Sequence, residues 1–131
     1  MKANQLYPEY KGGYGPGSYQ PIIDDLGSIL LQVDDEDYQG DSRVLIQKDE
    51  KYGILIFGWG SCSGCDALQA CESVSELDEL IEQIQSSVKW FDNSAECLHY
   101  FQNHDWQGDY SWHREETKKF INEAVDKLLY G

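Results

Sequence analysis

The apolar positions of this chain follow a strand pattern in its first half. β-Branched and apolar residues dominate Ser28–Val33, Arg43–Gln47 and Tyr52–Phe57, and four charged residues at 48–51 join the last two runs. Short apolar runs between polar turns are typical of β-strands, and the last two runs predict a hairpin. We therefore expect a small antiparallel sheet of about three strands.

The second half follows the spacing of α-helices. Ser73 and Glu76 have the spacing of a capping box, and the apolar residues after them predict an amphipathic helix over Ser73–Ser87. The same capping pattern begins at Asn93 and predicts a short helix that ends near His104. A second helix is therefore expected soon after the first.

A last amphipathic pattern extends from about Trp112 to Leu129. The three expected helices follow the three expected strands, and we expect them to pack on the sheet. This order predicts the α+β fold class.

The length of 131 residues indicates a single domain over residues 1–131. Residues 7–21 combine four tyrosines with glycines and all three prolines, a composition that disfavours both helix and strand. We interpret residues 1–21 as an arm or loop. Packing of this arm over the core is favoured over a role as an exposed recognition segment.

The chain is strongly acidic, with 24 Asp and Glu against 10 Lys and Arg and a formal net charge of −14. This charge disfavours direct binding to nucleic acid or to an anionic membrane, and it favours a protein partner with a basic surface. No Lys or Arg occurs from Tyr52 to Val88. The carboxylates expected to bind the partner are Asp34, Asp35, Glu36 and Asp37 in one turn, and Glu72, Glu76, Glu79 and Glu82 on the first predicted helix. The alternative is that these carboxylates are only solvated.

The first residues lack the apolar segment of a signal peptide, and the longest apolar run, Ile54–Phe57, is too short to span a bilayer. We therefore expect a cytoplasmic protein. In a reducing cytoplasm, closely spaced cysteines indicate metal binding or redox chemistry more often than a disulfide.

Three of the four cysteines lie within ten residues, in the segment that follows the third strand. Cys62 and Cys65 form a CxxC pair with Gly64 between them, and Cys71 follows six residues later. Such a turn can direct two thiolates at one metal ion, and a tetrahedral zinc site needs four ligands. We predict one structural zinc ion held by Cys62, Cys65 and Cys71, with His104 or His113 as the fourth ligand. A redox-active CxxC and buried free thiols are the alternatives.

Catalytic signatures are weak. His104 precedes Asp105, and His113 lies near Glu116, but neither pair has a serine or cysteine nucleophile at a recognisable turn. The acidic turn from Asp35 resembles the start of a calcium-binding loop, yet its twelfth position is an isoleucine where a glutamate is needed. We expect no enzymatic activity. A zinc-dependent hydrolase with His113 or Asp105 as the base is the alternative.

Three segments carry a resemblance to a known group of proteins. The sequence GSCSGCDAL at residues 60–68, the pair Trp90–Phe91, and the segment His104–His113 resemble a family of small phage and prophage proteins. The resemblance covers most of residues 43–129. In size, in charge and in its CxxC turn, the chain is also similar to a zinc-containing anti-CRISPR protein of phages.

This resemblance implies a non-enzymatic inhibitor that acts in the cytoplasm of a host bacterium. It would bind a basic surface of a type II RNA-guided nuclease and block DNA loading or cleavage. Such nucleases hold a heteroduplex in a positively charged channel, which an acidic face can occupy. A prophage protein with an unrelated partner is the other possibility.

Overall fold

The fold is built on one antiparallel sheet. The computed structural model describes residues 2–7, 19–35, 40–59, 70–104 and 114–130. The sheet has the order β1-β2-β3-β4, and its strands are β1 (Ser28–Asp34), β2 (Gly40–Lys48), β3 (Lys51–Trp59) and β4 (Lys89–Phe91). The three predicted strands are confirmed, and β4 adds an edge strand that the sequence pattern did not predict.

Five helices lie within the described residues. The three predicted helices correspond to α4, α5 and α7, and two helices of five residues each precede the sheet. None of the five is long and apolar enough to cross a membrane. Their bounds are α1 (Lys2–Leu6), α2 (Gln20–Asp24), α4 (Val74–Ser86), α5 (Ser94–Asn103) and α7 (Arg114–Tyr130).

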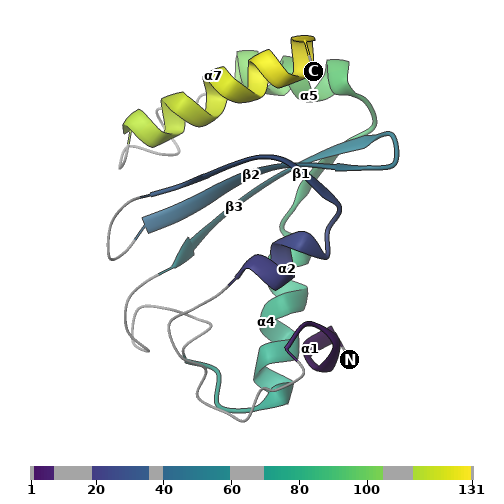
Figure 1. The fold of residues 1–131 in the computed structure, drawn as a ribbon, viewed down its shortest axis with the longest axis vertical. Helices are drawn as coiled ribbons and strands as arrows, with labels where there is room; N and C mark the ends of the chain where they lie inside the picture. Colours follow the sequence, from purple (N-terminus) through teal and green to yellow (C-terminus); the bar gives the residue numbers. More distant parts are fainter. Residues whose placement is uncertain (1, 8–18, 36–39, 60–69, 105–113, 131) are drawn as a thin grey trace.

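The helices cover both faces of the sheet, so the molecule has three layers (Figure 1). Along β2 the side chains alternate between the layers: Val44 and Ile46 pack with α1, α2 and α4, whereas Leu45 packs with α5 and α7. Two separate apolar cores result. One lies between the sheet and α1, α2 and α4, and the other lies between the sheet and α5 and α7.

This arrangement confirms the α+β class and corrects its details. The helices do not simply follow the strands, because α1 and α2 precede the sheet and β4 lies between α4 and α5. The predicted arm is also partly helical: α1 and α2 form at its two ends, where Tyr7 and Tyr19 are buried in the first core. Residues 8–18 of the arm lie outside the described residues.

A tight turn connects β2 to β3, as the sequence predicted. Lys48 pairs with Lys51, so Asp49 and Glu50 form a two-residue turn. Asp49 adopts a positive φ of 57°, a conformation that aspartate tolerates better than most residues. The hairpin places both long strands in register and fixes which residues of β2 face each core.

Candidate functional site

The exposed side of α4 carries the acidic stripe that the sequence predicted. Leu77 and Ile81 on the opposite side are fully buried in the first core, which fixes how the helix is turned. The spacing of the carboxylates then places them on the solvent side, because residues three or four apart share one face of a helix. The members of the stripe are all exposed: Glu76, Glu79 and Glu82 on α4, and Glu72 two residues before the helix begins.

The start of α4 is fixed by a capping box. The Ser73 hydroxyl accepts a hydrogen bond from the Glu76 backbone N–H at 3.1 Å, and the Glu76 carboxylate accepts one from the Glu72 N–H at 2.9 Å. The first bond satisfies a backbone donor that the helix itself leaves unpaired, and the second joins Glu76 to the residue before the cap. These bonds also hold Glu76 in place in the first turn of α4.

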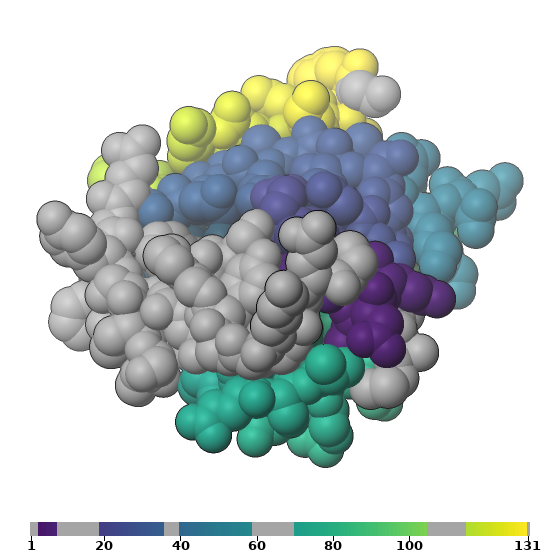
Figure 2. All heavy atoms as spheres, turned by 60° about the horizontal axis from the view of Figure 1, so that its bottom comes forward, coloured from purple at the N-terminus to yellow at the C-terminus, as the bar shows by residue number. Residues whose placement is uncertain are grey.

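A hollow of about 430 Å³ lies beside the stripe, where α1 and α2 meet α4. The Asp78 carboxylate accepts a hydrogen bond from the Ala3 N–H at 3.2 Å, and the Gln85 amide donates to the Ile22 carbonyl at 3.1 Å. These contacts join the short helices to α4. The hollow is lined by Asp78, Ile81, Glu82, Gln85 and Ser86. Figure 2 shows this end of the molecule, with α4 in teal at the lower edge.

The second predicted acidic cluster is divided by the structure. Asp34 is exposed at the end of β1, but Asp35 is only 4% exposed. Its carboxylate binds Arg43 and is therefore not available to a partner protein, which corrects its assignment to a binding surface. Glu36 and Asp37 lie outside the described residues.

The partner of Asp35 is a fully buried arginine that no sequence pattern indicated. Arg43 Nη1 donates to Asp35 Oδ1 at 2.7 Å, and neither side chain has solvent exposure. Asp35 Oδ2 accepts a second hydrogen bond, from the Asp41 N–H at 2.8 Å, and the Asp35 N–H donates to the Asp41 carbonyl at 3.0 Å. Asp35 therefore holds the end of β1 to Asp41 and Arg43 of β2 by hydrogen bonds.

The absence of a side chain at Gly40 leaves space for the Asp35 carboxylate. A Cβ atom at this position would lie 2.7 Å from Asp35 Cβ and Oδ2, closer than real Cβ atoms approach other atoms. A residue without a side chain is thus required where β2 begins. The glycine is a sequence signal for this close approach, but it does not reveal which residue approaches.

The predicted zinc ligands are only partly described. Cys71 is 5% exposed and belongs to the first core, at the start of α4. His104 follows α5 on the other face of the sheet, where its ring stacks on Tyr100 with centroids 4.6 Å apart. Because the sheet separates them, Cys71 and His104 cannot bind one ion. Cys62, Cys65 and His113 lie outside the described residues.

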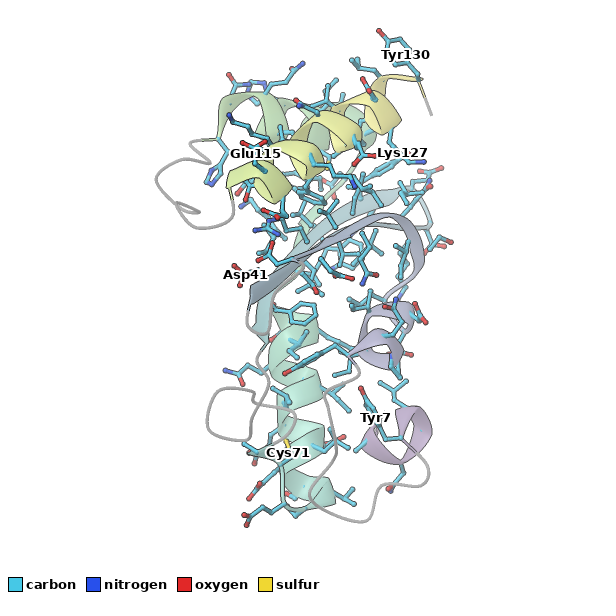
Figure 3. All side chains as sticks on the ribbon, turned by 60° about the vertical axis from the view of Figure 1, so that its left-hand side comes forward. Tyr7, Asp41, Cys71, Glu115, Lys127 and Tyr130 are labelled. Carbon is cyan, nitrogen blue, oxygen red and sulfur yellow. The ribbon has the colours of Figure 1, made fainter. Side chains whose placement is uncertain are left out.

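Within the described ranges no three His, Cys, Asp or Glu side chains are grouped as a metal site would require. Figure 3 labels Cys71 beside α4, far from α5 at the opposite end of the molecule.

Cys97 lies in the second core. It is fully buried on α5, and desolvation by burial raises the pKa of its thiol to about 12. A thiol with such a pKa stays protonated at physiological pH and is a poor nucleophile. Cys97 is therefore a packing residue.

An aromatic hollow at the β4 edge is the other surface feature that the sequence did not reveal. The Lys89 ammonium lies over the Tyr100 ring at 5.2 Å and over the Phe91 ring at 5.9 Å. These are the distances of cation–π contacts. The hollow has a volume of about 460 Å³ and is lined by Phe91, Ala95, Glu96, His99 and Tyr100.

No protein-family model, no curated protein and no solved structure matches this chain. Function is therefore inferred from its residues and their geometry.

Proposed function

We propose that the protein is a non-enzymatic binding protein that docks the acidic stripe of α4 on a basic surface of another protein. The observation that carries this proposal is the exposure of all four stripe carboxylates, three of them on a helix whose other side is fixed in the core and Glu72 just before it. A prepositioned row of like charges attracts an opposite surface without paying to order the helix on binding.

The charge of the whole chain supports the same partner class. The formal charge of −14 produces a negative field that raises the encounter rate with a basic surface and repels nucleic acid. No basic residue interrupts the segment from Tyr52 to Val88, which contains the stripe. The field and the stripe therefore favour a basic protein.

The partner we propose is a type II RNA-guided nuclease of a host bacterium, on the basis of the resemblance to phage anti-CRISPR proteins. Its heteroduplex channel is lined with basic residues, so an acidic helix in that channel would block DNA loading or cleavage. The protein would supply charge and shape there and would need no catalytic group.

A structural zinc ion is the second part of the proposal. Cys62, Cys65 and Cys71 would supply three of its four ligands, and it would stabilise the segment that leads into α4. Native mass spectrometry of protein purified without added metal tests this part. One bound zinc ion per chain is expected, with loss of the ion in Cys65→Ser, and a metal-free wild type would refute it.

The docking proposal is tested with two double charge reversals of equal size and spacing. Glu79→Lys/Glu82→Lys reverses two carboxylates of the stripe, whereas Glu123→Lys/Asp126→Lys reverses two exposed carboxylates with the same spacing on α7, on the other face of the sheet. We expect the first variant to weaken nuclease binding at least tenfold and the second to change it less than threefold, as measured by calorimetry.

Salt provides an independent readout. Affinity of the wild type should fall as ionic strength rises, because contacts between exposed charges are screened over about 8 Å at physiological salt. The proposal would be refuted by equal effects of the two double variants, or by an affinity that is the same at low and high salt.

A further inference from the structure

The buried Arg43 uses only part of its hydrogen-bonding capacity. Its Nη1 donates to Asp35, but neither Nε nor Nη2 has a hydrogen-bond partner among the residues that the structure describes. The side chain is 0% exposed. A buried charged donor without a partner is destabilising, because it has lost its hydrogen bonds to water and gained none in the protein.

The two unpartnered atoms lie on the same edge of the guanidinium. Nε–H and one N–H of Nη2 point in parallel from the planar group, and this fork matches the two oxygens of a carboxylate or a phosphate. Asp35 binds the opposite end of the guanidinium through Nη1. The ion pair therefore orients the guanidinium and leaves its bidentate edge available.

The surroundings of this edge follow from the strand register. Arg43 pairs with Val33 on β1 and with Ile56 on β3, and both neighbours belong to the core between the sheet and α5 and α7. Arg43 thus faces the layer of α7. Figure 3 shows the first turn of α7, at Glu115, above the same end of the sheet as Asp41.

The first turn of a helix carries partial positive charge from its unpaired N–H groups. The first turn of α7 also carries Glu115 and Glu116, so the attraction of an anion to this layer comes from the Arg43 guanidinium. A guanidinium favours an oxyanion over a neutral ligand.

We propose that the Nε and Nη2 edge of Arg43 is a binding site for a small oxyanion, a carboxylate or a phosphate group, in the layer between the sheet and α7. This site lies on the face of the sheet opposite the α4 stripe and does not depend on the proposed docking function. Because the guanidinium has no solvent exposure, entry of the anion requires local opening, and we expect slow exchange.

The test uses an unusual feature of the composition. Arg43 and Arg114 are the two arginines of the chain, so a ¹H–¹⁵N spectrum contains two Nε–H signals. Arg114→Lys removes one of them and thereby assigns the remaining signal to Arg43. Inorganic phosphate and acetate are titrated separately into the wild type, with sodium chloride at matched ionic strength as the control.

We expect the Arg43 Nε–H signal to shift saturably with phosphate or acetate and not with chloride, while the Arg114 signal moves little. A response to phosphate alone indicates a phosphate-type ligand, and a response to acetate indicates a carboxylate. The proposal is refuted if the Arg43 signal is unchanged by both anions, or if chloride shifts it equally.

Thermal unfolding gives a second readout. Phosphate or acetate at ten times its dissociation constant should raise the Tm of the wild type by about 4 °C. Arg43→Lys keeps the positive charge but loses the pair of parallel N–H donors, so its Tm should not rise with either anion. Lys119→Gln, which removes an exposed charge on α7, should respond like the wild type. An equal rise in Arg43→Lys would contradict the proposal, and the wild-type spectrum decides alone if that variant does not fold.

Discussion

At the scale of single residues, the ion pair of Arg43 and Asp35 has the largest energetic consequences. Removing both charges from water is costly, and their attraction offsets that cost only while both partners are present. The pair also joins the end of β1 to the start of β2 through the hydrogen bond between Asp35 and the Asp41 N–H. Loss of one partner therefore leaves the other charge buried without compensation, which destabilises the folded protein.

We predict a strong coupling between the two residues. Arg43→Met and Asp35→Asn should each lower the free energy of unfolding by about 3 to 5 kcal/mol, since each leaves a buried charge without its partner. The double variant should lose clearly less than the sum. Urea unfolding of the four proteins measures this cycle, and additive losses would show that the two side chains do not interact.

Cys97 gives a prediction about pH. The folded-state pKa of its thiol is raised to about 12 from an ordinary 9.0. Between these values the unfolded chain loses this proton while the folded protein keeps it, so stability falls as pH rises from about 9 towards 12. Below pH 9 both states are protonated and this group contributes no pH dependence.

The comparison with Cys97→Ala isolates this contribution. The variant loses packing at every pH, but its stability should fall less steeply than that of the wild type between pH 9 and 11. Denaturant unfolding at several pH values measures both slopes. Parallel curves would mean that the thiol titrates alike in both states.

At the scale of elements, the helix starts are set by local sequence. Ser73 caps α4 and Asn93 caps α5, each by accepting a hydrogen bond from the backbone N–H three residues later. The structure places both caps at the residues that the sequence indicated. Short-range chemistry of this kind can be predicted because both partners are close in the chain.

Ser73→Ala should lower stability by about 1 kcal/mol through loss of the cap. The matched control is Ser75→Ala, an exposed position inside α4 where alanine favours the helix. Circular dichroism during urea unfolding compares the two. Equal midpoints for Ser73→Ala and the wild type would show that the cap does not stabilise α4.

Other elements could not be predicted, for physical reasons. The three residues of β4 are too few to show a period, and the strand forms because Gly53 of β3 lets Val88 and Trp90 approach closely. The helices α1 and α2 are also too short for a period, and they pack on α4 through long-range contacts such as that of Ala3 with Asp78.

The same limit applies to the candidate site. The stripe of α4 follows from helical spacing, so it could be predicted. The burial of Arg43 could not, because it depends on the layer of α7 that covers its side of β2. The signal in the sequence is a single charged residue next to the apolar run Val44–Ile46, on a strand that proves to be covered on both faces.

At the scale of the molecule, the sheet separates two apolar cores. The same strands contribute to both cores, but each side chain packs in only one of them. Ile81 belongs to the core of α4, whereas Ile54 belongs to the core of α5 and α7. Substitutions in different cores should therefore be nearly independent, and substitutions within one core should interact.

We predict that Ile81→Val and Ile54→Val each cost about 0.5 to 1.5 kcal/mol and that their effects add within about 0.5 kcal/mol. The comparison pair, Ile81→Val with Ile46→Val, lies within one core and should deviate more from additivity. Urea unfolding measures all variants. A larger interaction across the sheet than within one core would contradict the separation of the two layers.

The two ends of the described chain lie at opposite ends of the molecule (Figure 1). Ala3 is hydrogen-bonded to Asp78 beside the acidic stripe, whereas Tyr130 is 84% exposed at the end of α7. An affinity handle placed after Tyr130 would present α4 to the solution when the protein is immobilised on a sensor surface. A handle on the α1 side would hold the stripe against that surface, so the same partner would give a weaker signal in that orientation.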